Sequence, residues 1–77
     1  MEGAAEEMEK LTTGTIIKDL RACHGISQRK LAEEINVSNA TISRIEGDEV
    51  IPTGRVLIKL ADYFGVNVSY LLGREDE

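Results

Sequence analysis

Residues 27–46 read SQRKLAEEINVSNATISRIE and contain two short helical patterns joined by a tight turn. A serine opens each pattern, and a serine at this position caps a helix by accepting a hydrogen bond from a free backbone amide of the first turn. Apolar residues recur at helical spacing in both segments, so each has one face suited to burial. The sequence therefore predicts helices over residues 28–35 and 39–46, with Asn36 and Val37 between them.

The second segment presents a polar face of small side chains and one arginine. Two helices joined by so short a turn cross at a wide angle, which leaves the outer face of the second helix projecting. Such a face fits the major groove of DNA, where side chains reach the edges of the bases. By their chemistry, Asn39 can pair with adenine, Arg44 with guanine, and Ala40 can contact a thymine methyl group.

This stretch resembles the helix-turn-helix of the phage repressor and Cro family, the xenobiotic-response-element type of bacterial regulator. The resemblance covers roughly residues 13–73 and rests on Gln28 and on the pairs Leu31-Ala32, Val37-Ser38, Ile42-Ser43, Ile45-Glu46, Leu60-Ala61, Gly65-Val66 and Leu71-Leu72. It implies an all-α fold, a compact five-helix bundle like that of lambda repressor. It also implies a sequence-specific transcriptional regulator, a repressor, that binds a palindromic operator in double-stranded DNA as a homodimer.

The resemblance assigns roles to individual residues. Arg21 is expected to form an ion pair with Glu46, which would brace the first helix against the third. The expected DNA-binding residues are Ser27, Gln28, Ser38, Asn39, Ala40, Thr41, Ser43 and Arg44. Arg55 is added because it lies in the first turn of a later helix, where it could reach a phosphate. The expected dimer interface consists of Val66, Val68, Tyr70, Leu71 and Leu72.

Several of these residues have structural alternatives. Ser27 and Gln28 can cap a helix as well as contact phosphate. Arg55 is as consistent with an isolated surface arginine as with a phosphate contact. The apolar C-terminal residues can close the core of the monomer instead of forming a dimer. Arg29 and Lys30 are expected to steer DNA electrostatically rather than to bind specific atoms.

The segment after the second helix departs from the family pattern. Asp48 and Glu49 stand where the family usually has a glycine followed by a basic residue, which puts a phosphate contact from this loop in doubt. Gly47 is expected to supply the positive φ of the turn one position earlier. The acidic pair favours a loop that repels an unsuitable partner or recruits a protein.

Three further helices are predicted from apolar spacing and end signals. Gly25 and Gly65 supply left-handed stops, while Thr53 and Ser69 supply caps. These helices are predicted over residues 15–24, 54–64 and 70–72. One small domain over residues 13–73 is therefore expected, between acidic tails at 1–12 and 74–77.

The overall charge at first argues against nucleic-acid binding. The net charge of the 77 residues is −5, and DNA-binding domains are usually basic. Much of the excess acid lies near the two ends, however, and residues 11–74 contain eight basic and seven acidic side chains. A nearly neutral domain can still have one basic face.

Catalytic, metal and membrane functions have no support in the sequence. Cys23 and His24 are adjacent rather than at ligand spacing, and a single cysteine cannot form an internal disulfide. With one histidine and no phosphate-binding glycine motif, neither an enzyme nor a cofactor is expected. No apolar run approaches the roughly 18 residues of a membrane span, so a soluble cytoplasmic protein is expected.

Two alternatives to a DNA-binding homodimer remain. The same fold can act as a protein-interaction module, such as an antitoxin that binds its toxin, or a partner of a polymerase subunit. The chain can also be the DNA-binding head of a larger sensor. A steep loss of DNA affinity with added salt favours DNA binding. A stable heterocomplex without DNA binding favours the interaction module.

Overall fold

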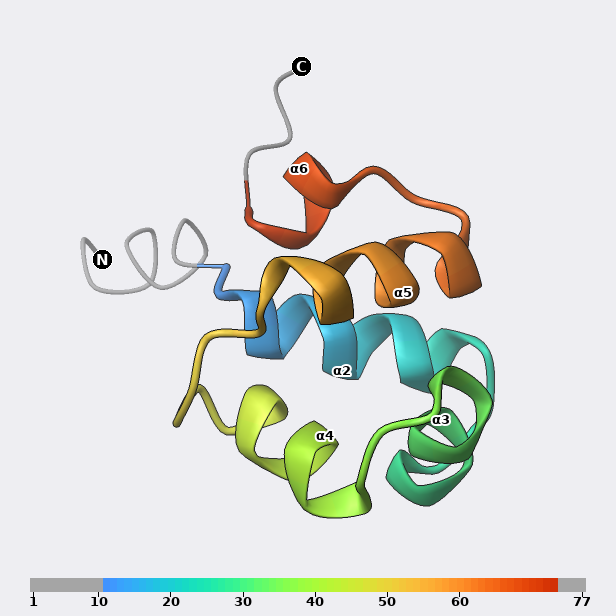
Figure 1. Cartoon of the computed structure of the whole chain (residues 1–77). Helices are drawn as coiled ribbons and strands as arrows, with labels where there is room; N and C mark the ends of the chain where they lie inside the picture. Colours follow the sequence, from blue (N-terminus) through green and yellow to red (C-terminus); the bar gives the residue numbers. More distant parts are fainter. Residues whose placement is uncertain (1–10, 74–77) are drawn as a thin grey trace, which may run out of the picture.

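The computed structural model describes residues 11–73, which form five α-helices and no strand (Figure 1). The predicted all-α, five-helix fold class is confirmed. The predicted acidic tails lie largely outside the described residues. The helices are α2 (Thr13–Cys23), α3 (Gln28–Ile35), α4 (Asn39–Glu46), α5 (Gly54–Phe64) and α6 (Val68–Leu71).

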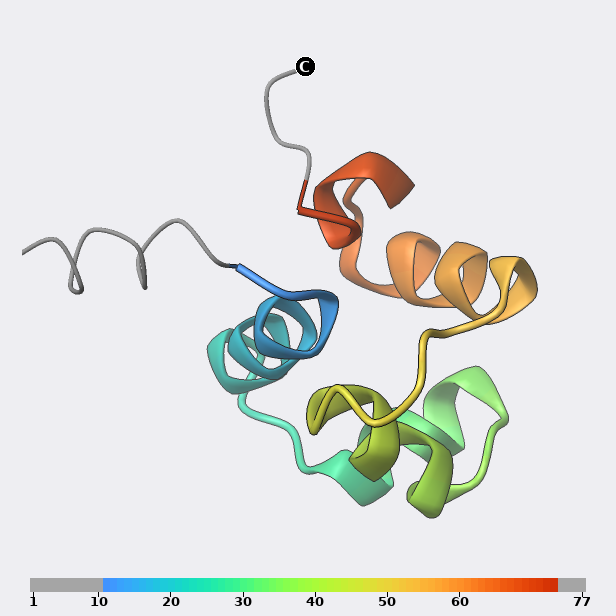
Figure 2. The ribbon, with the colours of Figure 1, turned by 90° about the vertical axis from the view of Figure 1, so that its left-hand side faces the viewer.

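The helices are arranged so that the pair α3 and α4 lies at one end of the domain and α6 at the other (Figures 1 and 2). α2 packs against α4, while α5 packs against both α3 and α6. The same order is visible after a quarter turn in Figure 2, where α4 stays at the bottom and α6 at the top. The outer surface of α4 is therefore left clear of the rest of the bundle.

The core contains apolar side chains from all five helices, at the three- and four-residue spacing that the sequence predicts. Burying one such side chain fully contributes roughly 1.5–3 kcal/mol. The largest fully buried side chains are Ile17, Leu31, Ile42, Ile45, Leu60 and Leu71.

A side chain caps the N-terminus of each of the first four described helices. Each capping oxygen accepts a hydrogen bond from the backbone amide three residues later, and such a cap contributes about 1 kcal/mol. The predicted caps of α3, α4 and α5 are confirmed. The capping residues are Thr12, Ser27, Ser38 and Thr53.

Two helix starts differ from the prediction. α2 begins at Thr13 rather than near Thr15, because Thr12 accepts a hydrogen bond from the Thr15 amide. α6 begins at Val68, and Asn67 occupies its N-cap position without a side-chain hydrogen bond. The prediction that Ser69 caps this helix was wrong, because the chain already turns into the helix one residue earlier, where Val68 packs on the core.

The turn after α4 also corrects the sequence analysis. Gly47 has φ −86°, whereas Asp48 has φ 59°, so the left-handed residue is the aspartate. Aspartate tolerates this conformation better than most residues. Its carboxylate accepts hydrogen bonds from the Thr12 hydroxyl (2.7 Å) and the Gly14 amide (3.1 Å). The loop is thereby tied to the first turn of α2.

The two ends of the described chain lie side by side, on the left-hand side of the molecule in Figure 1. Gly73 has φ 83°, and a Cβ atom on it would lie 3.0 Å from the Leu11 carbonyl oxygen. Both the backbone conformation and the close approach favour glycine here.

Gly14 lies where α2 comes closest to α4. A Cβ atom on it would overlap the carbonyl oxygen of Ile45 and lie 2.7 Å from the carbonyl oxygen of Glu46. Backbone oxygens cannot move aside unless the helices separate. We therefore expect Gly14→Ala to lower the free energy of unfolding by about 1–3 kcal/mol, the usual range for overpacking, as measured by urea denaturation.

Gly54→Ala is the matched control for this substitution. No atom lies within 4 Å of a Cβ on Gly54, in the first turn of α5. Alanine there is expected to stabilise the domain by about 0.4–1 kcal/mol, because it restricts the unfolded chain. Equal losses of stability for the two substitutions would contradict the close contact at Gly14.

Candidate nucleic-acid interface

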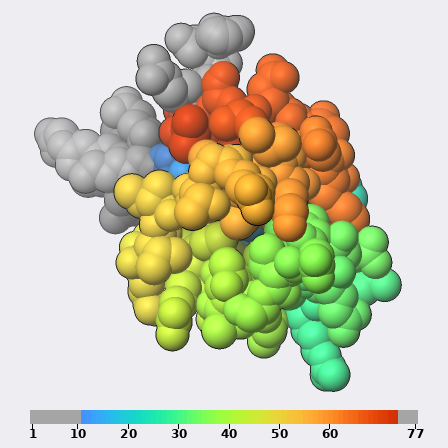
Figure 3. Space-filling view, viewed as in Figure 1, coloured from blue at the N-terminus to red at the C-terminus, as the bar shows by residue number. Residues whose placement is uncertain are grey.

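α4 exposes one continuous stripe of small and polar side chains. Asn39, Ala40, Ser43 and Arg44 are all exposed, while the two isoleucines of the helix are buried. Positions three and four residues apart share a helix face, so the structure brings these four predicted residues together. α3 and α4 form the lower part of the molecular surface in Figure 3, away from α6.

Ser38 and Thr41 have a more structural role than the sequence analysis assigns them. The Ser38 hydroxyl accepts a hydrogen bond from the Thr41 amide (3.1 Å), and the two hydroxyl oxygens lie 2.8 Å apart. Thr41 is also half-buried. Their side chains therefore fix the start of α4, beside the exposed stripe.

The start of α3 contains the other predicted contacts. The Ser27 hydroxyl accepts a hydrogen bond from the Lys30 amide (3.0 Å) and so caps the helix. The Gln28 amide nitrogen Nε2 donates to Glu46 Oε1 (3.0 Å), which places Gln28 beside the C-terminal end of α4. A carboxylate can only accept, so the carbonyl oxygen and the second N–H of the Gln28 amide remain available.

Arg21 and Glu46 form the expected ion pair. Arg21 Nε and Nη2 donate to the two carboxylate oxygens of Glu46 at 2.7 and 3.0 Å, and Nη1 donates to the Ile26 carbonyl at 3.0 Å. The side chains are 18% and 4% exposed, so water screens this bidentate pair little. With Gln28, the pair joins α2, α3 and α4 in one network that sequence analysis found only in part.

The charge of Glu46 is maintained by its donors. Burial alone would raise the pKa of Glu46, but hydrogen bonds from Arg21 and Gln28, together with the charges of Arg21 and Lys18, lower this pKa below its ordinary value. The hydrogen bond to Glu46 raises the pKa of Arg21, against the opposing effect of burial. Both groups are therefore ionised at neutral pH.

This lowered pKa predicts a loss of stability in acid. Glu46 has an unfolded-state pKa of about 4.3, so its contribution to stability is complete above that pH and is lost as the pH falls through the lower folded-state pKa. Urea denaturation from pH 7 to pH 3 should show this decline once the pH falls below about 4.3. Glu46→Gln should be less stable at pH 7 and decline less steeply in acid. Parallel pH profiles for the two proteins would contradict this prediction.

Other cations lie outside the stripe. Arg55 is exposed in the first turn of α5, on a different element from α4. Arg29 and Lys30 pair with Glu33 (3.8 Å) and Glu34 (3.1 Å) one turn along α3. Both pairs are exposed, so solvent screens them and they contribute little to stability. The pairing also reduces the positive charge that α3 offers for steering DNA.

The predicted dimer surface is only partly available. Leu71 is 0% exposed and belongs to the core, so its assignment to an interface was wrong: a helix as short as α6 docks by burying this side chain. Val66 and Val68 are half-buried against the core. Tyr70 and Leu72 are 40% and 43% exposed and remain candidates.

Sequence analysis missed a further exposed apolar side chain on α5. Ile58 is 56% exposed, although its neighbour Leu57 is buried. The sequence does indicate that Ile58 faces outward, because it lies outside the helical spacing of the buried apolar residues. These are Leu57, Leu60, Ala61 and Phe64.

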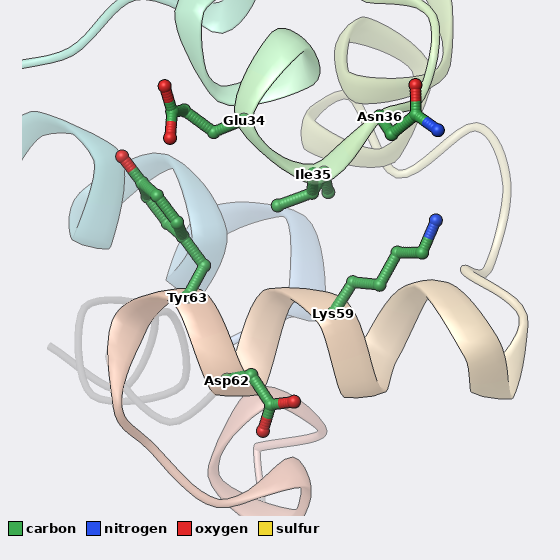
Figure 4. Close-up of a pocket in the computed structure, with 6 residues that line it drawn as sticks. All are labelled: Glu34, Ile35, Asn36, Lys59, Asp62 and Tyr63. Atoms are coloured by element: carbon green, nitrogen blue, oxygen red, sulfur yellow. The ribbon is translucent and has the colours of Figure 1, made fainter.

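A surface depression of about 400 Å³ lies between the C-terminal end of α3 and α5 (Figure 4). Lys59 and Tyr63 extend from α5 toward α3, and Ile35 lies between them. None of its lining residues is a predicted site residue. They are Glu34, Ile35, Asn36, Lys59, Asp62 and Tyr63.

The remaining candidates show no catalytic or metal arrangement. Cys23 is exposed, and His24 Nδ1 lies 2.9 Å from the Leu20 carbonyl oxygen while its ring packs edge-on against Phe64. Within residues 11–73, no three His, Cys, Asp or Glu side chains are grouped as metal ligands. None of the described helices has the length and apolar character needed to cross a bilayer.

Comparison with known proteins identifies relatives of this fold. The chain is 32% identical over 66 residues to the HTH-type transcriptional regulator ImmR of Bacillus subtilis, covering 86% of this chain and 52% of ImmR. It is 34% identical to the uncharacterized HTH-type regulator MJ0272 of Methanocaldococcus jannaschii, covering 79% of this chain and 92% of MJ0272. The immunity repressor of Bacillus phage phi105 is 34% identical over 65 residues, covering 84% of this chain and 45% of the repressor. The chain thus spans about half the length of two of these relatives.

A solved structure and a family model agree with these relatives. The P22 c2 repressor, solved in complex with synthetic operator 9T, superposes with a TM-score of 0.81 at 30% identity, covering 86% of this chain and all of that one. The family model described as helix-turn-helix, HTH_3, matches residues 17–71, well over half of the chain. This protein therefore belongs to the helix-turn-helix family of the phage repressor and Cro type.

Proposed function

We propose that this protein is a sequence-specific DNA-binding transcriptional regulator that represses by occupying its operator. The observation that carries the proposal is the exposed stripe of Asn39, Ala40, Ser43 and Arg44 on a helix that projects from the bundle. A repressor of the same fold solved with operator DNA supports it, as do relatives named as an immunity repressor and a transcriptional regulator.

The proposed mechanism places α4 in the major groove. There Arg44 can donate two hydrogen bonds to guanine, and Asn39 can pair with adenine. The start of α3, with Ser27 and Gln28, supplies amide donors for an adjacent phosphate. Because the network around Glu46 joins Gln28 to α4, phosphate contact and base contact are made by one rigid unit.

The relatives also bear on the principal partner. Those named above are transcriptional regulators or a repressor, which favours DNA over a toxin or a polymerase subunit. The acidic pair Asp48 and Glu49 is the feature that the sequence analysis connected with protein recruitment, and Asp48 bonds to Thr12 and Gly14 within the fold.

We also propose that the protein binds DNA as a homodimer. Two half-sites read by a symmetric dimer lie about 34 Å apart, one turn of the double helix. Tyr70, Leu72 and Ile58 are exposed apolar residues on α6, just after it and on α5, away from the surface of α4. A contact between these elements would leave both copies of α4 free.

The proposal can be tested by hydrodynamic mass and by selection of DNA from a random pool. We expect a dimer that enriches an inverted repeat, with affinity that falls steeply as salt is added. A protein that enriches no sequence and binds no duplex at low salt would refute the proposed function.

The interface can be tested separately with the double substitution Tyr70→Ser and Leu72→Ser. We expect the protein to become monomeric and its affinity for the inverted repeat to fall at least about tenfold, while binding to a single half-site is unchanged. Ile51→Ser is the control, because Ile51 is 84% exposed but lies in the loop before α5. A dimer that survives the double substitution would refute this interface.

A further inference from the structure

Glu49 follows the proposed recognition helix and lies against its last turn. Its backbone amide donates to the Arg44 carbonyl oxygen at 2.9 Å, so the chain folds back onto α4. A Cβ atom on Gly47 would lie 3.4 Å from Glu49 Oε2, which places the carboxylate over the end of the helix. A negative charge is therefore held next to the backbone of a residue proposed to read DNA.

The two acidic residues of this loop differ in their partners. Asp48 uses both carboxylate oxygens in hydrogen bonds to Thr12 and Gly14. Glu49 is exposed, and its carboxylate forms no ion pair or side-chain hydrogen bond with any other residue from 11 to 73. Asp48 thus has a structural role within the fold, whereas the charge of Glu49 faces solvent.

The charge of Glu49 is also poorly placed for stability. The C-terminal end of a helix carries a partial negative charge, so a carboxylate there is unfavourable and a lysine or arginine would be favoured. Intramolecular electrostatics therefore give no reason for an acid at this position. The charge of Glu49 therefore acts on a molecule that binds near the C-terminal end of α4.

If α4 binds in the major groove as proposed, DNA phosphates come close to its C-terminal end. The major groove is flanked by two phosphate backbones, with one negative charge for about every 1.7 Å of helix axis. A carboxylate at the end of a helix in that groove repels the nearest phosphates. Resting on the proposed function, we infer that Glu49 is an affinity-limiting residue of the DNA interface.

This repulsion has a definite functional consequence. Attraction to phosphates supplies essentially all non-specific binding and acts on every sequence alike. By reducing this attraction, Glu49 weakens the binding of a single copy of the domain to DNA. Stable occupancy of the operator then depends on base contacts from α4 and on binding by the second copy of the domain in the dimer. For two unit charges about 7 Å apart at the dielectric constant of water, Coulomb's law gives an expected reduction in affinity of roughly two- to threefold.

The test compares Glu49→Gln and Glu49→Lys with the wild-type protein. Fluorescence anisotropy would measure binding to a random-sequence duplex and to the selected operator between about 50 and 200 mM salt. Glu49→Gln should bind both DNAs roughly two- to threefold more tightly. Glu49→Lys should bind more tightly still, and its slope of log K against log salt should become more negative by about 0.9.

Asp62→Asn is the matched control. Asp62 is an exposed acid on α5, so its replacement changes the net charge equally but away from α4. Charges more than about 8–10 Å apart are largely screened at these salt concentrations, so its DNA affinity should be unchanged. Thermal midpoints no lower than that of the wild type would show that all variants remain folded.

The outcomes separate this inference from the proposed function. If Glu49→Gln and Asp62→Asn tighten binding equally, net charge explains the effect and the inference is overturned. If the wild type binds its operator and Glu49→Gln binds no more tightly, the inference fails while the proposed function stands. If no variant, Glu49→Lys included, binds duplex DNA at low salt, both fail together.

Discussion

Arg21→Ala is expected to lower the free energy of unfolding by about 1.5–3 kcal/mol, the usual contribution of hydrogen bonds to a charged group in a part-buried pair. Glu46 is 4% exposed and accepts two of its three side-chain hydrogen bonds from Arg21. Without Arg21, its carboxylate keeps only the neutral donor Gln28, and the effect of burial on its pKa is no longer opposed by the guanidinium. In a domain this small, the loss is a large part of the total stability.

Urea denaturation monitored by helical circular dichroism would measure this effect. Arg29→Ala is the control, because Arg29 makes an exposed pair with Glu33 at 3.8 Å and should change stability by less than about 1 kcal/mol. The penalty of Arg21→Ala should also shrink as the pH falls through the lowered pKa of Glu46, because protonation removes the charge that Arg21 pairs with. A penalty independent of pH would show that lost packing, rather than lost charge pairing, is responsible.

Arg44→Ala is expected to weaken binding to the selected operator about 10- to 100-fold, corresponding to about 1–3 kcal/mol for one bidentate contact with a base. Arg44 is exposed and forms no ion pair with another described residue, so the fold should be unaffected. Because its guanidinium is proposed to read guanine, discrimination at one base pair of each half-site should relax.

A second arginine substitution distinguishes a contact with a base from attraction to a phosphate. Arg29→Ala removes the same charge from α3, where Arg29 is paired and exposed. It should weaken binding slightly and equally for all sequences. Parallel titrations of the operator and its single-base variants would compare the two substitutions. A uniform loss for Arg44→Ala would exclude base reading by this residue.

Sequence reasoning predicted the helices because their signals are local. Ser27, Ser38 and Thr53 act on amides three residues away, and the apolar spacing is complete within each helix. Both signals depend on backbone geometry that neighbouring residues share. The helix-turn-helix was therefore predictable with its bounds, and the family resemblance then indicated how the remaining helices pack.

What sequence reasoning missed depends on contacts between distant segments. Asp48 adopts a left-handed conformation while its carboxylate bonds to Thr12 and Gly14, which are 36 and 34 positions earlier. The hydrogen bond from Gln28 to Glu46 spans 18 positions. No periodic pattern encodes such partners, so they became visible only in three dimensions.

The C-terminal residues show a different limit. α6 has four residues, which is too short for apolar spacing to separate an inward side from an outward one. Leu71 and Leu72 are adjacent leucines, yet one is 0% and the other 43% exposed. The roles of the exposed residues in DNA contact remain predictions, because the bases they meet are a property of the operator.

The close approach of Gly73 to Leu11 has a consequence for how this domain can be carried by other proteins. Since the chain enters and leaves at neighbouring points, a host protein could accommodate the whole domain within one of its surface loops with little distortion. A short peptide joining residues 73 and 11 would likewise allow new termini elsewhere, for example in the loop between α4 and α5. The helices could thus follow one another in a different order along the chain and still pack in the same arrangement.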